Sequence, residues 1–184
     1  MEPGMSREGR AFVTRVAIGV GVTAGIAAVV WSAGYRYNET ASLPVGIWRI
    51  HTAANLQAGT IVNFCPPPNA ILMEGRRRDY LANGPCPGGL ESMFKPIVAL
   101  SGDRVALTAH GVTVNGALVP NSTPAPHDGL GRTLPVPADQ TVPVGFVWLV
   151  SSYSADSFDS RYFGPVAVAS IIGTADPIFV KEAP

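Results

Sequence analysis

Proline spacing is the feature that most restricts what this chain folds into. Sixteen of its 17 prolines lie between residues 36 and 184, where they come too close together for long helices. Short β-branched and aromatic runs alternate with turn residues in the same region, so we expect a mainly β domain. The expected strands are Val45–Ile50, Thr60–Phe64, Phe94–Leu100, Arg104–Thr108, Val112–Val114, Ala117–Val119 and Gly145–Val150.

Three local patterns refine this expectation. Asn115-Gly116 between two apolar runs predicts a hairpin, because both residues accept the positive φ angles of a type I′ turn. The segment 70–82 is the one stretch of the β region that favours a helix, and we interpret its arginines, Arg76 to Arg78, as a solvated face. Residues 120–142 are rich in Pro, Asp and Gly and predict a long exposed loop.

An uncharged segment of 20 residues, Val16 to Tyr35, precedes the β region. It is long enough to cross a hydrocarbon core of roughly 30 Å. Three arginines precede the segment, and this bias favours a cytoplasmic N-terminus. We therefore expect a cytoplasmic segment (1–15), a transmembrane anchor (16–35) and one exported periplasmic domain (36–184). The alternative is a cleaved secretory signal, because Ser32-Ala33-Gly34 resembles a small-residue cleavage site.

Charge and cysteine content exclude several classes of function. The net charge is zero and only 14% of residues are charged, so nothing favours nucleic-acid binding. The two cysteines, Cys65 and Cys86, are a candidate disulfide in an oxidising compartment. The three histidines are scattered without ligand spacing, so we expect no metal and no other cofactor.

Lys95 is the first residue that suggests chemistry, because apolar neighbours surround it in the run from Met93 to Leu100. A lysine acts as a base only when its amine is neutral, and desolvation in an apolar pocket favours that form. The structural alternative is that its ammonium group reaches solvent from the end of a strand.

Two other clusters add polar groups. Ser42 directly precedes a bend that Pro44 and Gly46 define, and this bend would present its hydroxyl at the start of a strand. Asp159 and Arg161 lie two residues apart, so on a strand their side chains would share a face and could pair. The structural alternative is an exposed ion pair that contributes under about 1 kcal/mol.

The order of these features resembles the bacterial signal peptidase I superfamily, and in particular its conjugative-transfer branch, the TraF-type pilin-processing peptidases. The residues that carry the closer resemblance are Asn38-x-Thr40-x-Ser42-x-Pro44-x-Gly46, Phe64-Cys65-Pro66-Pro67, Gly84-Pro85-Cys86-Pro87-Gly88-Gly89, Asp128-Gly-Leu-Gly131-Arg132 and Ser157-Phe-Asp-Ser-Arg-Tyr-Phe-Gly-Pro165. The resemblance covers the chain from the anchor to about Pro177, and it implies an antiparallel, signal-peptidase-like β domain at the inner membrane.

The resemblance also implies roles for single residues. Ser42 would be the nucleophile and Lys95 the general base. Thr40 would help to hold the oxyanion. Ser157 would orient the lysine amine, and Asp159 and Arg161 would brace the site.

The implied function is a Ser/Lys endopeptidase that matures an exported pilin precursor, with type IV secretion machinery as a partner. In this branch the pilin's own amino terminus can resolve the acyl-enzyme, which gives a cyclic product. Pro96, Ser101 and the sequence Ser151-Ser152-Tyr153 depart from the wider superfamily. A general type I signal peptidase that cleaves signal-peptide-bearing precursors is one alternative, and a non-catalytic, membrane-anchored pilin-binding component is another.

Overall fold

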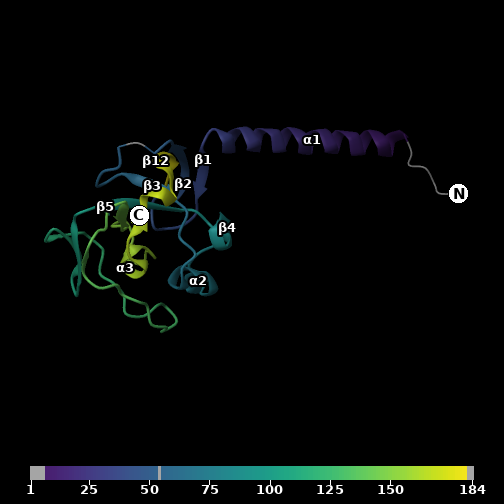
Figure 1. Ribbon diagram of the computed structural model, residues 1–184. Helices are drawn as coiled ribbons and strands as arrows, with labels where there is room; N and C mark the ends of the chain where they lie inside the picture. The colour runs from purple at the N-terminus through teal and green to yellow at the C-terminus, as the bar shows by residue number, and fades with distance from the viewer. Residues whose placement is uncertain (1–6, 54, 182–184) are drawn as a thin grey trace. The chain divides into compact units, whose positions relative to one another are not determined.

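The computed structural model describes residues 7–53 and 55–181, and the chain divides into two compact units between Arg36 and Tyr37 (Figure 1). The first unit is one long helix, α1 (Arg7–Ser32), with no buried side chain. Among the described residues it is the one helix long and apolar enough to cross a membrane, and it fits a single-pass anchor or a signal sequence. Residues 1–6 of the predicted cytoplasmic segment lie outside the described residues.

Two hydroxyls of helix α1 are bonded within the helix itself. The hydroxyls of Thr14 and Thr23 donate to carbonyls one turn earlier, at 2.9 Å and 3.0 Å. At the other end, the guanidinium group of Arg36 donates to the carbonyl of Trp31 at 2.8 Å and lies 3.4 Å from the centre of its ring. The two threonines therefore leave no unpaired hydroxyl in the helix, where such a group would be costly in lipid.

The second unit contains two sheets, whose paired strands run antiparallel. Antiparallel pairing confirms the mainly β class that the proline spacing predicts. The larger sheet has the order β1 (Tyr35–Asn38), β2 (Gly46–His51), β12 (Ile171–Val180), β3 (Ile61–Phe64), β5 (Met93–Ala99), β10 (Phe146–Leu149) and β11 (Val166–Ala167). The smaller sheet has the order β8 (Ala117–Leu118), β7 (Gly111–Val114), β6 (Arg104–Thr108) and β9 (Gln140–Thr141).

Short elements complete this unit. Helix α2 (Ala70–Arg77) confirms the predicted helix but ends earlier, and the Asn69 side chain caps its start by accepting from the Leu72 amide at 2.9 Å. A second helix, α3 (Ser160–Phe163), contacts α2. The remaining elements are β4 (Asn83–Cys86) and the 3₁₀ turns η1 (Pro87–Gly89) and η2 (Val168–Ser170).

Strands β7 and β8 form the hairpin that the sequence predicts. Asn115 and Gly116 have φ angles of 50° and 86° between β7 and β8, which confirms the hairpin and its turn. The predicted solvated face holds for Arg77, which is exposed and pairs with Glu74, but Arg76 and Arg78 bind other segments of the protein. Arg76 donates to Asn83 at 2.8 Å, and Arg78 donates to the carbonyl of Thr133 at 2.9 Å.

The loop 120–142 also differs in part from the expectation. It is mostly irregular, but β9 lies near its end and Ser122 is buried within it. The Asp128 carboxylate closes a turn in it by accepting from the Leu130 and Arg132 amides, both at 2.9 Å, and Tyr80 donates to the same carboxylate.

A disulfide joins Cys65 and Cys86, with a Cα–Cα distance of 5.4 Å, and confirms the candidate pair. It connects the end of β3 to the end of β4 across 21 residues of sequence. A loop of this length stabilises the fold by roughly 3 kcal/mol in the chain-entropy model.

The core lies in three clusters, two of which position the polar residues described below. One packs Leu43 with Trp48, Phe94 and Ala175, so the residue after Ser42 is anchored in the interior. The largest includes Ile97, which follows Lys95 on the same face of β5. Lys95 therefore points into the side of the sheet that packs the main core.

Candidate active site

The turn that carries Ser42 is organised by Asn38, which is buried at the end of β1. Its side-chain amide donates to three carbonyls of the turn, those of Thr40, Leu43 and Pro44, at 3.0 Å, 3.2 Å and 3.1 Å. One side chain thus satisfies backbone groups that have no strand partner. The sequence contains Asn38 in its serine motif, but nothing in the motif reveals this role.

The hydroxyls of Thr40 and Ser42 lie 3.0 Å apart. Thr40 has one hydroxyl proton, and it donates that proton to Asn38 Oδ1 at 2.9 Å. Ser42 must therefore be the donor in the contact with Thr40. The structure brings these two predicted site residues together, and it leaves the lone pairs of Ser42 free to face a reacting group.

Lys95 lies on β5 opposite Val62 of β3, and its side chain is only 3% exposed. Burial lowers the pKa of its amine from the ordinary value of 10.5 to about 8; the charge of Asp159 opposes this shift and that of Arg161 adds to it. About a tenth of such a group is neutral at pH 7, and half is neutral near pH 8. Among the described residues, Lys95 has neither a side-chain hydrogen bond nor an ion pair.

Asp159 and Arg161 form a fully buried ion pair, with 2.8 Å between Asp159 Oδ2 and Arg161 Nη2. The pair is therefore not the exposed ion pair of the structural alternative, and it lies at the start of a helix rather than on a strand. Asp159 caps α3 and accepts from the Arg161 amide at 3.1 Å and from Arg161 Nε at 2.9 Å, so the two side chains meet because the chain begins a helical turn.

The Arg161 guanidinium also holds the surrounding loop. It donates to the carbonyls of Ala155 at 2.8 Å, Ser157 at 3.1 Å and Asn121 at 3.1 Å. A buried arginine is costly unless its charge and its donors are satisfied, and here both conditions are met. The pair therefore holds the segment between β10 and α3, and its predicted role in bracing a catalytic site stays a prediction.

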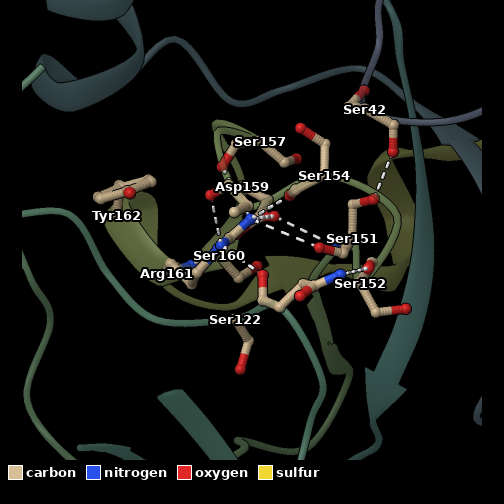
Figure 2. A network of polar contacts seen from close by, with 12 residues as sticks. Ser42, Ser122, Ser151, Ser152, Ser154, Ser157, Asp159, Ser160, Arg161 and Tyr162 are labelled. Atoms are coloured by element: carbon tan, nitrogen blue, oxygen red, sulfur yellow. Dashed lines mark hydrogen bonds and ion pairs between the residues drawn. The ribbon is translucent and has the colours of Figure 1, made fainter. Parts of the chain in front are cut away.

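Ser151 links this pair to the serine turn (Figure 2). Its amide donates to Asp159 Oδ2 at 3.0 Å, and its hydroxyl donates to the backbone carbonyl of Ser42. In the sequence, Ser151 is distinguished only as a departure from the wider superfamily. Because the two residues lie 109 positions apart, no local pattern predicts their contact.

Ser157 is buried at 3% exposure, and its hydroxyl has no hydrogen-bond partner among the described residues. No hydrogen bond joins it to Lys95 in that part of the chain. An unpaired buried hydroxyl costs about 1–3 kcal/mol, so this group is available to a partner that arrives with substrate or a proton. Its predicted role in orienting the lysine amine stays a prediction.

Three features define the candidate site: a serine on a turn that Asn38 organises, a buried lysine whose pKa is lowered to about 8, and a buried carboxylate–guanidinium pair. Asp159 connects them, because its charge acts on Lys95 and its carboxylate binds Ser151, which in turn binds the Ser42 carbonyl. Nucleophilic catalysis by serine needs a nearby base, and a desolvated lysine is a known solution. Sequence comparison agrees with this chemistry. Residues 9–180 match the family described as signal peptidase, peptidase S26, and the chain belongs to that family.

Within the family, this chain is similar to conjugal transfer proteins named TraF, which confirms the resemblance noted in the sequence. It is 38% identical to a probable conjugal transfer protein TraF of Sinorhizobium fredii over 94% of this chain and 91% of that protein. It is 41% identical to the conjugal transfer protein TraF of Agrobacterium fabrum over 81% and 84% of the two chains. It is 40% identical to a plasmid transfer protein TraF of Escherichia coli over 89% and 93%.

A crystal structure of a signal peptidase I from Enterococcus faecalis is also similar, with 20% identity and a TM-score of 0.38 over 67% of this chain and 98% of that chain.

Proposed function

We propose that this chain is a membrane-anchored Ser/Lys endopeptidase that matures an exported pilin precursor for conjugative transfer. The observation that carries the proposal is the burial of Lys95, which lowers the pKa of its amine to about 8. A lysine that served only as a surface cation would keep its ordinary pKa. Membership of a peptidase family and similarity to conjugal transfer proteins support the same reading.

In the proposed acylation step, the Ser42 hydroxyl turns its proton from Thr40 to the neutral amine of Lys95, which takes it as Ser42 Oγ attacks the scissile carbonyl. The new C–O bond gives a tetrahedral oxyanion. The Ser42 amide and the Thr40 hydroxyl donate to that oxyanion, for which Thr40 must turn its proton away from Asn38. When the C–N bond breaks, the Lys95 ammonium group protonates the leaving amine.

The acyl-enzyme ester is then resolved by one of two nucleophiles. Water, deprotonated by Lys95, gives a linear pilin and free Ser42. The amino terminus of the same pilin gives a cyclic product that lacks one water relative to the linear form. In both routes Lys95 accepts a proton from the attacking group and returns it to Ser42 Oγ, so the enzyme ends in its starting state.

The proposed location follows from α1 and the arginines around it. A single-pass helix with its N-terminus in the cytoplasm places the β domain in the periplasm, at the inner membrane. The proposed partners are a pilin or another signal-peptide-bearing precursor as substrate and the type IV secretion machinery. The disulfide suits an oxidising compartment.

The intact mass of the transfer pilin tests this function. Pilin from cells with the wild-type chain is compared with pilin from cells with Ser42→Ala, and Ser152→Ala is the matched control because its side chain is exposed. We expect pilin of the mature mass in cells with wild type or Ser152→Ala, and unprocessed precursor in cells with Ser42→Ala. A pilin that matures equally in Ser42→Ala cells overturns the proposal and favours the pilin-binding component, and accumulation of many unrelated precursors in those cells favours a general signal peptidase.

A further inference from the structure

Ser151 joins two parts of the site that lie far apart in sequence. Its hydroxyl contacts the backbone of Ser42, and its amide contacts the carboxylate of Asp159. We infer that Ser151 is a positioning residue, whose hydroxyl fixes the backbone of Ser42 and thereby aims the Ser42 side chain. This inference rests on the proposed function, in which Ser42 is the nucleophile.

The direction of the hydrogen bond from Ser151 is determined by its surroundings. Ser151 is completely buried, and its Oγ accepts from the Tyr153 amide at 3.2 Å. The single hydroxyl proton is then free to point at the Ser42 carbonyl, which has no proton of its own. Figure 2 shows this contact running from Ser42 to Ser151, while the neighbouring Ser152 side chain points elsewhere.

The carbonyl of Ser42 belongs to the peptide plane that follows the nucleophile. A rotation of this plane about the Cα–C bond of Ser42 changes where its Cβ and hydroxyl lie relative to the plane. Asn38 holds the next two carbonyls, those of Leu43 and Pro44, but it lies at the start of the same turn. Asn38 therefore shapes the turn internally, whereas Ser151 ties the turn to the sheet and loop beside it.

The same residue also holds the charged group that acts on the base. The Ser151 amide donates to Asp159 Oδ2, and the charge of Asp159 favours the protonated form of Lys95. Ser151 thus binds both the backbone of the nucleophile, Ser42, and the carboxylate of Asp159, whose charge acts on the base, Lys95. Misplacement of a reacting atom by about 1 Å can lower a rate by about a hundredfold.

A covalent label tests the inference without any pilin. Full-length wild type, Ser151→Ala, Ser152→Ala and Ser160→Ala are purified in detergent and treated with a fluorophosphonate, and peptide mass spectrometry identifies the labelled residue. Ser151→Ala removes the hydroxyl but keeps the amide that binds Asp159. Ser160 is a matched buried control, because its Oγ accepts from the Leu149 amide at 3.0 Å and does not contact Ser42.

We expect Ser151→Ala to lower the maximal labelling rate of Ser42 by about tenfold to a hundredfold. The pH at half-maximal rate should stay near 8, because the burial of Lys95 is unchanged. Ser152→Ala should label like wild type, and Ser160→Ala should lower the melting temperature without a comparable loss of rate. If Ser151→Ala does not fold, Ser151→Cys keeps the side-chain volume with a weak donor and should show the same loss.

Two results overturn the inference alone: labelling of Ser151→Ala at the wild-type rate, or a loss no larger than that of Ser160→Ala at equal folded fraction. Failure of the proposed function looks different. In that case wild type is not labelled at Ser42, or its labelling is as fast in Lys95→Ala, and the positioning role falls with it.

Discussion

Asp159 and Arg161 form a fully buried ion pair that acts on Lys95 with opposite signs. The negative charge of Asp159 raises the pKa of the Lys95 amine, and the positive charge of Arg161 lowers it, while burial lowers it most. The pair therefore has two separable consequences, one for the stability of the loop and one for the protonation of the base.

Replacing one member of this pair should shift the pH dependence of the reaction. Asp159→Asn removes the charge that favours the ammonium form, so half-maximal labelling of Ser42 should move below pH 8. Arg161→Met leaves Asp159 unopposed and should move it above pH 8. Labelling rates measured across pH check both directions, with Asp156→Asn as an exposed control nearby. Shifts of the same sign in both variants would contradict this assignment.

Arg161→Met should also destabilise the protein strongly. Removing one partner of a buried pair leaves the other charge uncompensated, which typically costs about 3–5 kcal/mol. Three loop carbonyls, those of Asn121, Ala155 and Ser157, lose a donor as well. Urea unfolding of the full chain in detergent measures the change. The double variant Asp159→Asn/Arg161→Met should lose less than the sum of the two single variants, and strict additivity would speak against the pair.

Lys95→Met should abolish labelling of Ser42 and stabilise the fold at neutral pH. The folded pKa of about 8 lies below the ordinary 10.5, so the unfolded chain binds more protons between these values. The free energy of unfolding of wild type should therefore rise with pH across that window. The methionine variant should be more stable at pH 7 by roughly 3 kcal/mol and lose this advantage by about pH 10.5. An advantage that does not change with pH would rule out a depressed lysine pKa.

Asn38→Ala should loosen the serine turn. Three carbonyls lose their donor, and an unpaired buried group costs about 1–3 kcal/mol. We expect a lower melting temperature together with slower labelling of Ser42, because Thr40 also loses its acceptor. Asn121→Ala is a comparison variant, since its side chain donates to the carbonyl of exposed Ser152 at 3.0 Å. Equal labelling by both variants would show that the Asn38 contacts are not needed at the site.

Local sequence patterns predict much of this fold. The strands around Trp48, Val62, Ile97 and Val105 and the Asn115-Gly116 hairpin lie where periodicity and turn residues indicate, because each signal spans a few residues. Strand β12 is not predicted, although it pairs with both β2 and β3. It contains Gly173, Asp176 and Pro177, which disfavour a strand locally, and its pairing on both sides overrides that preference.

The candidate site, like the fold, is predicted only in part by the sequence. Ser42, Lys95 and the Asp159–Arg161 pair are identified as candidate site residues from the sequence alone, by their residue types and their neighbours. The burial of the ion pair and the contact from Ser151 to Ser42 are not identified in this way, because both depend on packing between segments far apart in the chain. Sequence motifs indicate which side chains could take part in catalysis. Tertiary structure decides which of them lie close enough for an ion pair or a hydrogen bond.

The pH dependence of covalent labelling at Ser42 tests the central claim, that Lys95 is the base for this serine. We predict a rate in wild type that rises with pH and is half-maximal near pH 8, as the buried amine loses its proton, and no labelling of Ser42 in Lys95→Ala. A Ser42 that reacts equally fast with and without Lys95, or a midpoint at the ordinary lysine value of 10.5, would contradict the account.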